Sequence, residues 1–200
     1  IIPPEKPVDI PVVAACDVTN PLFGVDGAAY VFAPQKGANE EQVGLLDRGL
    51  HHMADILKRD LNFNSENLPG AGAAGGLGAG AAAFLNAELR SGIDIVLDEF
   101  GFDKFAANAD VVITGEGRFD SQSANGKVVS GVCKRAAKEG AKVYAVCGCA
   151  SNDADPAALG IEKLFVSSDG THSMDELQLS CRQELFDAAS ALAEEIMQLD

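Results

Sequence analysis

An apolar segment at Val111–Thr114 runs directly into a loop of polar and charged side chains, and a helical pattern follows at about residues 126–139. Further apolar segments at Lys142–Cys147 and Lys163–Val166 also lead into polar loops and then helical segments. Strands that alternate with helices predict parallel β-α-β units with right-handed crossovers. Residues 111–113 are all apolar, which is typical of a parallel strand covered by helices on both faces. The sequence therefore predicts an α/β fold.

Each of the three predicted strands ends in a loop with polar side chains. These loops lie at residues 114–120, 148–153 and 167–171. Parallel strands bring their carboxyl ends to one edge of a sheet, and open α/β folds bind their ligands there. We therefore expect a ligand site at this edge, built from the three loops.

The first of these loops carries the widest range of chemical groups. Arg118 presents a planar fork of donors that suits a carboxylate or a phosphate, and Glu116 and Asp120 supply carboxylates for a metal ion or a proton. The other candidates in this loop are Gly115, Gly117, Ser121, Ser123 and Lys127. In the alternative interpretation, Asp120 and Ser121 only cap a turn, and Arg118 pairs with Glu116.

The charge balance argues against one class of partner. The chain has 15 basic and 30 acidic residues and a net charge of −15, so we expect no nucleic-acid partner. No apolar run reaches the roughly 18 residues of a membrane span, so no membrane partner is expected either. The five cysteines lie mostly in apolar runs, which favours reduced thiols in a cytoplasmic protein over metal ligands.

The first hundred residues follow a different pattern. A short strand is expected at Pro11–Cys16, and Tyr30–Ala33 is a further strand candidate. Asn39 and Gln42 have the spacing of a capping box at the start of a helix. Apolar residues three and four positions apart then predict its buried face, namely Val43, Leu46, Leu50, Met53 and Leu57.

A glycine-rich segment at Pro69–Gly80 precedes a helix predicted at about Ala81–Leu89. Gly70, Gly72 and Gly75 match the G-x-G-x-x-G spacing of dinucleotide-binding loops, but no strand pattern precedes them. Two interpretations are therefore kept. The glycines let backbone segments approach closely, or they bind a ligand phosphate at the helix N-terminus.

Four blocks of this sequence resemble the bacterial type I glycerate kinases, in the same order and with similar spacing. The blocks are Ala15–Leu22, Pro34–Ala38, Leu68–Ala79 and Ile113–Ser123, the last with Gly126–Lys127. The resemblance implies a portion of a flavodoxin-like parallel sheet plus part of a second, inserted α/β domain. By that pattern, residues 1–106 are the C-terminal part of the inserted domain, and residues 107–200 are the C-terminal part of the flavodoxin-like domain.

The same resemblance implies a cytoplasmic, ATP-dependent kinase that phosphorylates D-glycerate to a phosphoglycerate with the help of Mg²⁺. Family members also have a front half with an Asp-Ser-Tyr/Phe-Lys loop and a Gly-Gly-Ser-Ala-Thr-Asn-Asp-Gly-Gly block. Neither block occurs in this sequence. We therefore expect a C-terminal fragment of a family member, inactive without the missing N-terminal half.

The resemblance also implies roles for individual residues. Glu116, Arg118 and Asp120 are the catalytic candidates, and Glu116 and Asp120 are also the Mg²⁺ candidates. The candidates for binding glycerate are Asp17, Asn20, Ser121 and Ser123. Those for binding nucleotide or phosphate are Lys36, Gly70, Gly72, Gly75, Gly115, Gly117 and Lys127.

Two other functions are kept as alternatives. One is a non-catalytic binding or regulatory module derived from this fold. The other is a nucleotide-dependent oxidoreductase that uses the Gly70–Gly75 segment. The kinase interpretation itself leaves two places for the nucleotide, the glycine-rich segment and the loop at residues 115–127.

Overall fold

The computed structural model describes residues 1–3, 5–6, 9–124 and 128–199, and the chain divides into two compact units, Ile1–Gly92 and Ile93–Asp200. The division falls earlier than the boundary at residues 106/107 expected from the resemblance. Two short helices, α4 (Gly92–Glu99) and α5 (Phe102–Ala106), therefore lie almost entirely in the second unit. The assignment of the units to inserted and flavodoxin-like domains stays a prediction.

Arg135 explains why α4 and α5 belong with the second unit. From α6 (Val128–Glu139), its guanidinium donates to the two carboxylate oxygens of Asp103 at 2.6 and 2.7 Å, and it also pairs with Asp98. The Arg135 side chain is only 13% exposed. A two-pronged ion pair of this kind fixes orientation as well as distance, so both short helices are tied to α6.

The second unit is built on a three-stranded parallel sheet. Its strands are β3 (Val111–Phe119), β4 (Lys142–Ala150) and β5 (Ile161–Val166), in the order β3-β4-β5. This arrangement confirms the predicted α/β fold class. Both β3 and β4 continue beyond their predicted ends.

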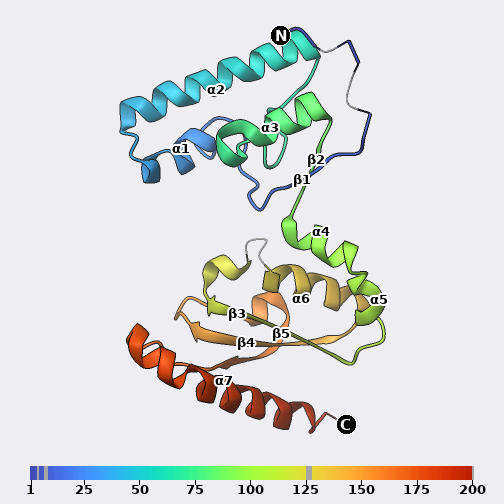
Figure 1. Cartoon of the computed structure of the whole chain (residues 1–200), viewed down its shortest axis with the longest axis vertical. Coiled ribbons are helices and arrows are strands. Elements are labelled where there is room, and N and C mark those ends of the chain that lie inside the picture. The colour runs from blue at the N-terminus through green and yellow to red at the C-terminus, as the bar shows by residue number, and fades with distance from the viewer. Residues whose placement is uncertain (4, 7–8, 125–127, 200) are drawn as a thin grey trace. The chain divides into compact units, whose positions relative to one another are not determined.

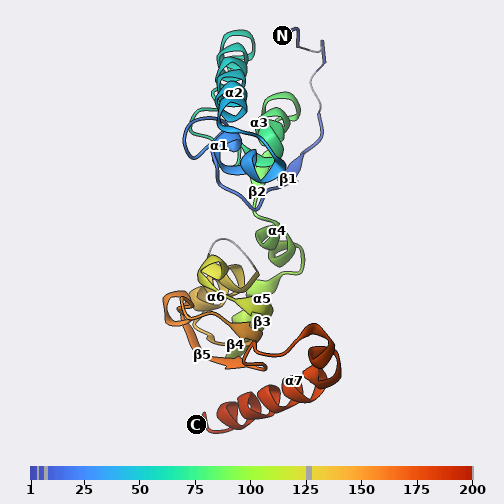
Figure 2. The same ribbon diagram turned by 90° about the vertical axis from the view of Figure 1, so that its left-hand side faces the viewer.

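Helices cover both faces of this sheet (Figures 1 and 2). Alternate residues of β4 face opposite sides: Val143 and Cys147 pack with α6, whereas Tyr144 packs with α7 (Met174–Ile196). Ser173 and Glu176 have the spacing of a capping box, which predicts a helix start, and both hydrogen bonds of the box form at the start of α7. The apolar spacing in the sequence predicts an inner face for this helix at Leu177, Cys181, Leu185, Leu192, Ile196 and Leu199. Of these, Leu192 is buried, whereas Cys181, Leu185 and Leu199 are exposed.

The described part of the first unit contains a two-stranded parallel sheet and three α-helices. Strands β1 (Val13–Ala15) and β2 (Glu88–Arg90) pair in register, and the helices α1 (Ala28–Phe32), α2 (Glu40–Leu61) and α3 (Ala73–Leu85) pack on one another. Figure 1 shows α1 and α3 alongside the long α2. The capping box of α2 is present as predicted, with both of its hydrogen bonds.

Two predictions for the first unit are wrong. The strand candidate at Tyr30–Ala33 is mostly helix α1, in which Ala28 and Ala29 are buried. The helix predicted up to Leu89 ends at Leu85, because Asn86 takes up the left-handed conformation with φ 50° and stops it. The residues that follow are then free to form β2.

Short 3-10 turns complete the two units. They lie at Pro34–Lys36, Ser121–Ala124 and Ala157–Leu159 and are labelled η1, η2 and η3. The part of the chain that the structure describes contains no bilayer-spanning helix.

The close approach of the glycine-rich segment to the turn after β1 leads to a first prediction. A Cβ on Gly72 would lie 2.2 Å from the carbonyl oxygen of Pro21, whereas a Cβ on Gly80 would meet nothing within 4 Å. Gly72→Ala should therefore lower the free energy of unfolding by about 1–3 kcal/mol, as overpacking does. Gly80→Ala should raise it by about 0.5–1 kcal/mol, because alanine favours a helix. Urea unfolding followed by circular dichroism measures both changes, and an equal effect of the two variants would contradict the packing argument.

Candidate functional site

The predicted first loop is in large part strand. Gly115, Glu116 and Arg118 continue the pairing of β3 with β4, and Phe119 still lies opposite Ala150. A Cβ on Gly115 would lie 2.4 Å from the carbonyl oxygen of Val146, so only glycine allows the strands this approach. The loop interpretation of residues 115–119 is therefore wrong, and Arg118 projects from a strand end.

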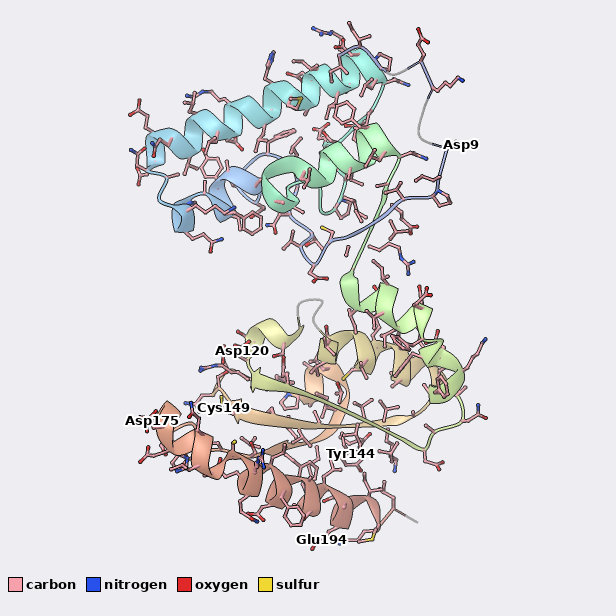
Figure 3. The ribbon with its side chains drawn as sticks, viewed as in Figure 1. Asp9, Asp120, Tyr144, Cys149, Asp175 and Glu194 are labelled. Atoms are coloured by element: carbon pink, nitrogen blue, oxygen red, sulfur yellow. The ribbon has the colours of Figure 1, made fainter. Side chains whose placement is uncertain are left out.

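The turn after β3 fixes Asp120. The Ser123 hydroxyl accepts a hydrogen bond from the Asp120 backbone N–H at 3.0 Å, and the Ser123 N–H donates to the Asp120 carbonyl at 2.9 Å. Ser123 is completely buried. Its hydroxyl therefore supports the turn, and Figure 3 places Asp120 at the carboxyl end of β3.

Arg118 pairs with Asp120. The Arg118 Nε lies 3.8 Å from Asp120 Oδ2, and the Arg118 side chain is 67% exposed. The alternative interpretation from sequence had Glu116 as the partner of Arg118. A contact at this distance and exposure holds the two side chains together only weakly.

The loop after β4 joins the first loop through Asp153. Hydrogen bonds from Ser151 and Ser121 hold the pKa of the Asp153 carboxyl below its ordinary value. The Ser151 N–H also donates to the Phe119 carbonyl at 2.9 Å. The Ser121 side chain, predicted to bind substrate, thus donates a hydrogen bond to the Asp153 carboxylate instead. Sequence reasoning placed residues 148–153 at this edge but did not single out Asp153 or Ser151.

The third loop begins at the same edge. Ser167 N–H donates to the Cys147 carbonyl at 2.9 Å, and Ser168 N–H donates to the Gly148 carbonyl at 2.8 Å. Figure 3 shows Cys149 at the same end of the sheet as Asp120, with Tyr144 well away from it. The structure therefore brings the three predicted loops to one edge.

Glu116 occupies an unusual position for a carboxylate. Its Oε1 atom is buried and has no hydrogen-bond partner among the described residues. It lies opposite Cys147 in the strand register. Burial, together with the charges of Cys149 and Glu116, raises the pKa of the Cys147 thiol to about 11. A buried acceptor without a partner costs free energy, which marks this oxygen as a place for a cation or a proton.

Lys127 and the residues before it at 125–126 lie outside the described residues. Among those that are described, no three or more His, Cys, Asp or Glu side chains gather as a metal-binding group.

In the first unit, Asp17 and Asn20 follow the carboxyl end of β1, as predicted. Asp17 Oδ1 accepts a hydrogen bond at 2.7 Å from the Gly92 N–H, just beyond β2. The Asn20 side-chain amide donates to the Asp26 carbonyl at 2.9 Å. Asn20 therefore serves as a turn former.

The glycine-rich segment packs against that turn. Gly70 and Gly72 are buried, and the Gly72 N–H donates to the Asn20 carbonyl at 3.0 Å. A Cβ on Gly70 would lie 2.7 Å from Cys16 Sγ. Close backbone packing thus accounts for these two glycines, which removes the basis for the oxidoreductase alternative. Gly75 is exposed, and it lines a cavity together with Lys36.

Comparisons with known proteins agree with this architecture. The sequence matches the model of a family described as the glycerate kinase family over residues 4–197. A glycerate kinase from Bacillus cereus is 46% identical over 168 residues, which cover 84% of this chain and 44% of the relative. A glycerate 2-kinase from Escherichia coli is 44% identical over 163 residues, which cover 81% of this chain and 43% of the relative.

A solved structure from Salmonella typhimurium LT2, assigned as glycerate kinase 2, superimposes with a TM-score of 0.72 at 38% identity. The match covers 96% of this chain and 50% of the Salmonella chain. The chain therefore spans about half the length of the relatives that it matches.

Burial of the thiols gives a second prediction. All five cysteines are free, Cys133 and Cys147 are buried with pKa values raised to about 11, and Cys181 is exposed. At pH 8, iodoacetamide should modify Cys181 first, since reaction requires the thiolate and access to it. Cys133 and Cys147 should react only after unfolding in urea. Mass spectrometry of the alkylated peptides provides the test, and early labelling of Cys147 would mean that this edge opens in the native state.

Asp153 gives a third prediction. Because its pKa is lowered in the folded chain, it contributes stability above the unfolded value of about 3.9, and this contribution is lost as the pH falls through the lower folded value. Asp153→Asn should therefore reduce the loss of stability between about pH 5 and pH 2. Thermal unfolding across this range tests it. Asp110→Asn is the control, since the Asp110 carboxylate is exposed and makes no hydrogen bond or ion pair among the described residues. Parallel pH profiles for all three proteins would contradict the argument.

Proposed function

Because the chain belongs to the glycerate kinase family, we propose that it supplies the C-terminal half of an ATP-dependent kinase that converts D-glycerate to a phosphoglycerate. The observation that carries the proposal is a family match across nearly the whole chain, with Arg118 and Asp120 together at a strand end. Phosphoryl transfer depends on positioning, positive charge at the phosphates and a route for the acceptor proton. The proposed location is the cytoplasm.

Asp120 is the proposed acceptor of the proton from the glycerate hydroxyl. Its backbone is held on both sides by Ser123, so its carboxylate starts from a fixed turn. Arg118 is the proposed partner of the transferring phosphoryl group or of the glycerate carboxylate. A bound anion would replace the contact between Arg118 and Asp120. Losing this contact costs little free energy, because it is long and exposed.

Glu116 fits the proposed requirement for Mg²⁺. Its Oε1 is buried and meets no hydrogen-bond partner among the residues that the structure describes, and it is the type of hard oxygen ligand that Mg²⁺ takes. Asp120 is the second carboxylate candidate. Mg²⁺ in kinases is usually held by one or two carboxylates together with the phosphates, so a larger cluster is not required. When bound, the ion would neutralise charge that develops on the phosphates.

Asp17 and Asn20 are the proposed contacts for glycerate from the first unit. Asp17 uses one carboxylate oxygen on the Gly92 N–H, which orients the carboxylate toward a ligand hydroxyl. Backbone N–H groups at Gly115 and Gly117, together with Lys127, are proposed to contact phosphate. These roles follow the positions of the family blocks in this sequence.

The fourth prediction concerns Asp120. In a protein that contains this chain together with the family's front half, Asp120→Asn should lower kcat by at least about 100-fold, because the general base is lost. Coupled detection of ADP, with the product identified by NMR, gives the measurement. Asp110→Asn serves as the matched control and should leave turnover near normal.

Near-normal turnover in Asp120→Asn would remove Asp120 from the role of base. A folded protein with both halves that phosphorylates no glycerate would overturn the kinase proposal in favour of a non-catalytic module. The 200-residue chain by itself should give no product, because the front-half blocks are not part of it.

A further inference from the structure

A groove runs beside α2 in the first unit. Its larger part is a hollow of about 540 Å³ between α1, η1 and α2, where Phe32, Leu46 and Leu50 provide an apolar lining. Gly75 of α3 also lines it. Its volume lies within the range of small-molecule sites, roughly 300–1,000 Å³.

The groove continues into a second, more polar hollow at the start of α2. This hollow of about 340 Å³ shares Lys36 and Leu46 with the first and adds Gly37 and Gln42. The Gln42 side-chain oxygen accepts a hydrogen bond from Asn39 N–H in the capping box. Its side-chain amide N–H groups make no hydrogen bond among the described residues, so donors are left for a ligand.

Lys36 lies where the two hollows meet. It is the one cation that lines either of them, and it has no ion pair among the described residues. Glu40 and Glu41 in the first turn of α2 line neither hollow. In a chain with a net charge of −15, an unpaired ammonium group in a concave site favours an anionic ligand.

The apolar surface of the groove is open to solvent. Leu45 and Leu46 are 62% and 49% exposed, although the helical pattern had predicted Leu46 as core. An apolar hollow, a cation at its mouth and a polar extension match a ligand with a flat apolar part and a polyphosphate. Among the two reactants of the proposed reaction, only ATP has that shape.

We infer that this groove binds the adenine nucleotide, with the base in the larger hollow and the phosphates at Lys36. The inference rests on the proposed kinase function, and it favours the first unit over the loop at residues 115–127 as the place of the base. It also gives the glycines different roles. Gly70 and Gly72 allow close backbone packing, whereas Gly75 lines the nucleotide groove.

Calorimetric titration of the 200-residue chain with ATP, adenosine and inorganic triphosphate tests whether the base binds in the larger hollow and the phosphates bind at Lys36. Lys36→Met should weaken ATP and triphosphate binding by about ten-fold or more and leave adenosine binding within about two-fold. Leu46→Glu should weaken ATP and adenosine binding by about ten-fold and have a smaller effect on triphosphate. Amide NMR signals of Gly49 and Gly75, which line the larger hollow, should shift with adenosine.

Lys58→Met is the matched control, because Lys58 is exposed in the last turn of α2 and lines neither hollow. It should bind all three ligands as the unchanged chain does. Circular dichroism checks that each variant is folded, and Leu46→Ala provides a milder change at the same position.

Failure of millimolar ATP to bind the chain would overturn the inference, as would unchanged ATP affinity in both Lys36→Met and Leu46→Glu. If Leu46→Glu instead converts a dimer to a monomer without altering ATP binding, a second copy covers the groove and the inference is wrong. Nucleotide binding as expected, in a protein with both halves that does not phosphorylate glycerate, would overturn the kinase proposal alone.

Discussion

Parallel pairing of β3 with β4 continues to Phe119 and Ala150, and the carboxyl edge of the second unit depends on it. The pairing carries Glu116 and Arg118 out on a rigid strand instead of a loop. It also brings Ser151 to the end of β3, where its N–H meets the Phe119 carbonyl. Functional groups on paired strands are held more narrowly than groups on a free loop. Gly115 is the residue that makes this possible, because any side chain there would collide with β4.

The same edge contains a carboxylate, that of Glu116, whose burial lowers the stability of the fold. A carboxylate oxygen of Glu116 is buried and has no hydrogen-bond partner in the described part of the chain, and the neighbouring strand holds the buried Cys147 thiol. An apolar residue at position 116 would pack on this face without the desolvation cost of a charge. Breaks in local consistency of this kind are expected at functional sites. This desolvation cost supports the Mg²⁺-binding role that is proposed for Glu116.

Local signals in the sequence predicted local structure well. The capping boxes at Asn39 and Ser173 begin α2 and α7 as predicted, because both of their hydrogen bonds form within one turn. Strand β2 was missed because a three-residue strand depends on its partner β1, far away in sequence. The extension of β3 was missed for a related reason, since Gly115 and Gly117 are typical of turns until a neighbouring strand lies close enough to pair.

Side-chain roles were harder to predict than strands and helices. The sequence placed Asp120, Ser121 and Ser123 in one segment. It did not indicate that the buried Ser123 hydroxyl accepts a hydrogen bond from the Asp120 N–H, or that Ser121 donates one to Asp153. These facts depend on which atoms meet across two loops. In the same way, periodicity placed Leu46 on the apolar face of α2 but did not reveal that this part of the face lines an open groove.

Arg135 and Arg118 carry the same charge but differ in how strongly it is held by neighbouring carboxylates. Arg135 is mostly buried and holds Asp103 by two short hydrogen bonds, so its charge is committed to joining helices. Arg118 is mostly exposed and lies 3.8 Å from Asp120. An acidic chain repels anionic ligands at long range, so binding them requires local cations that are not committed to buried ion pairs. Arg118 and Lys36 meet that requirement in their separate units, because neither is held in a buried ion pair. A bound anion would compete at Arg118 with one weak contact, and at Lys36 chiefly with water.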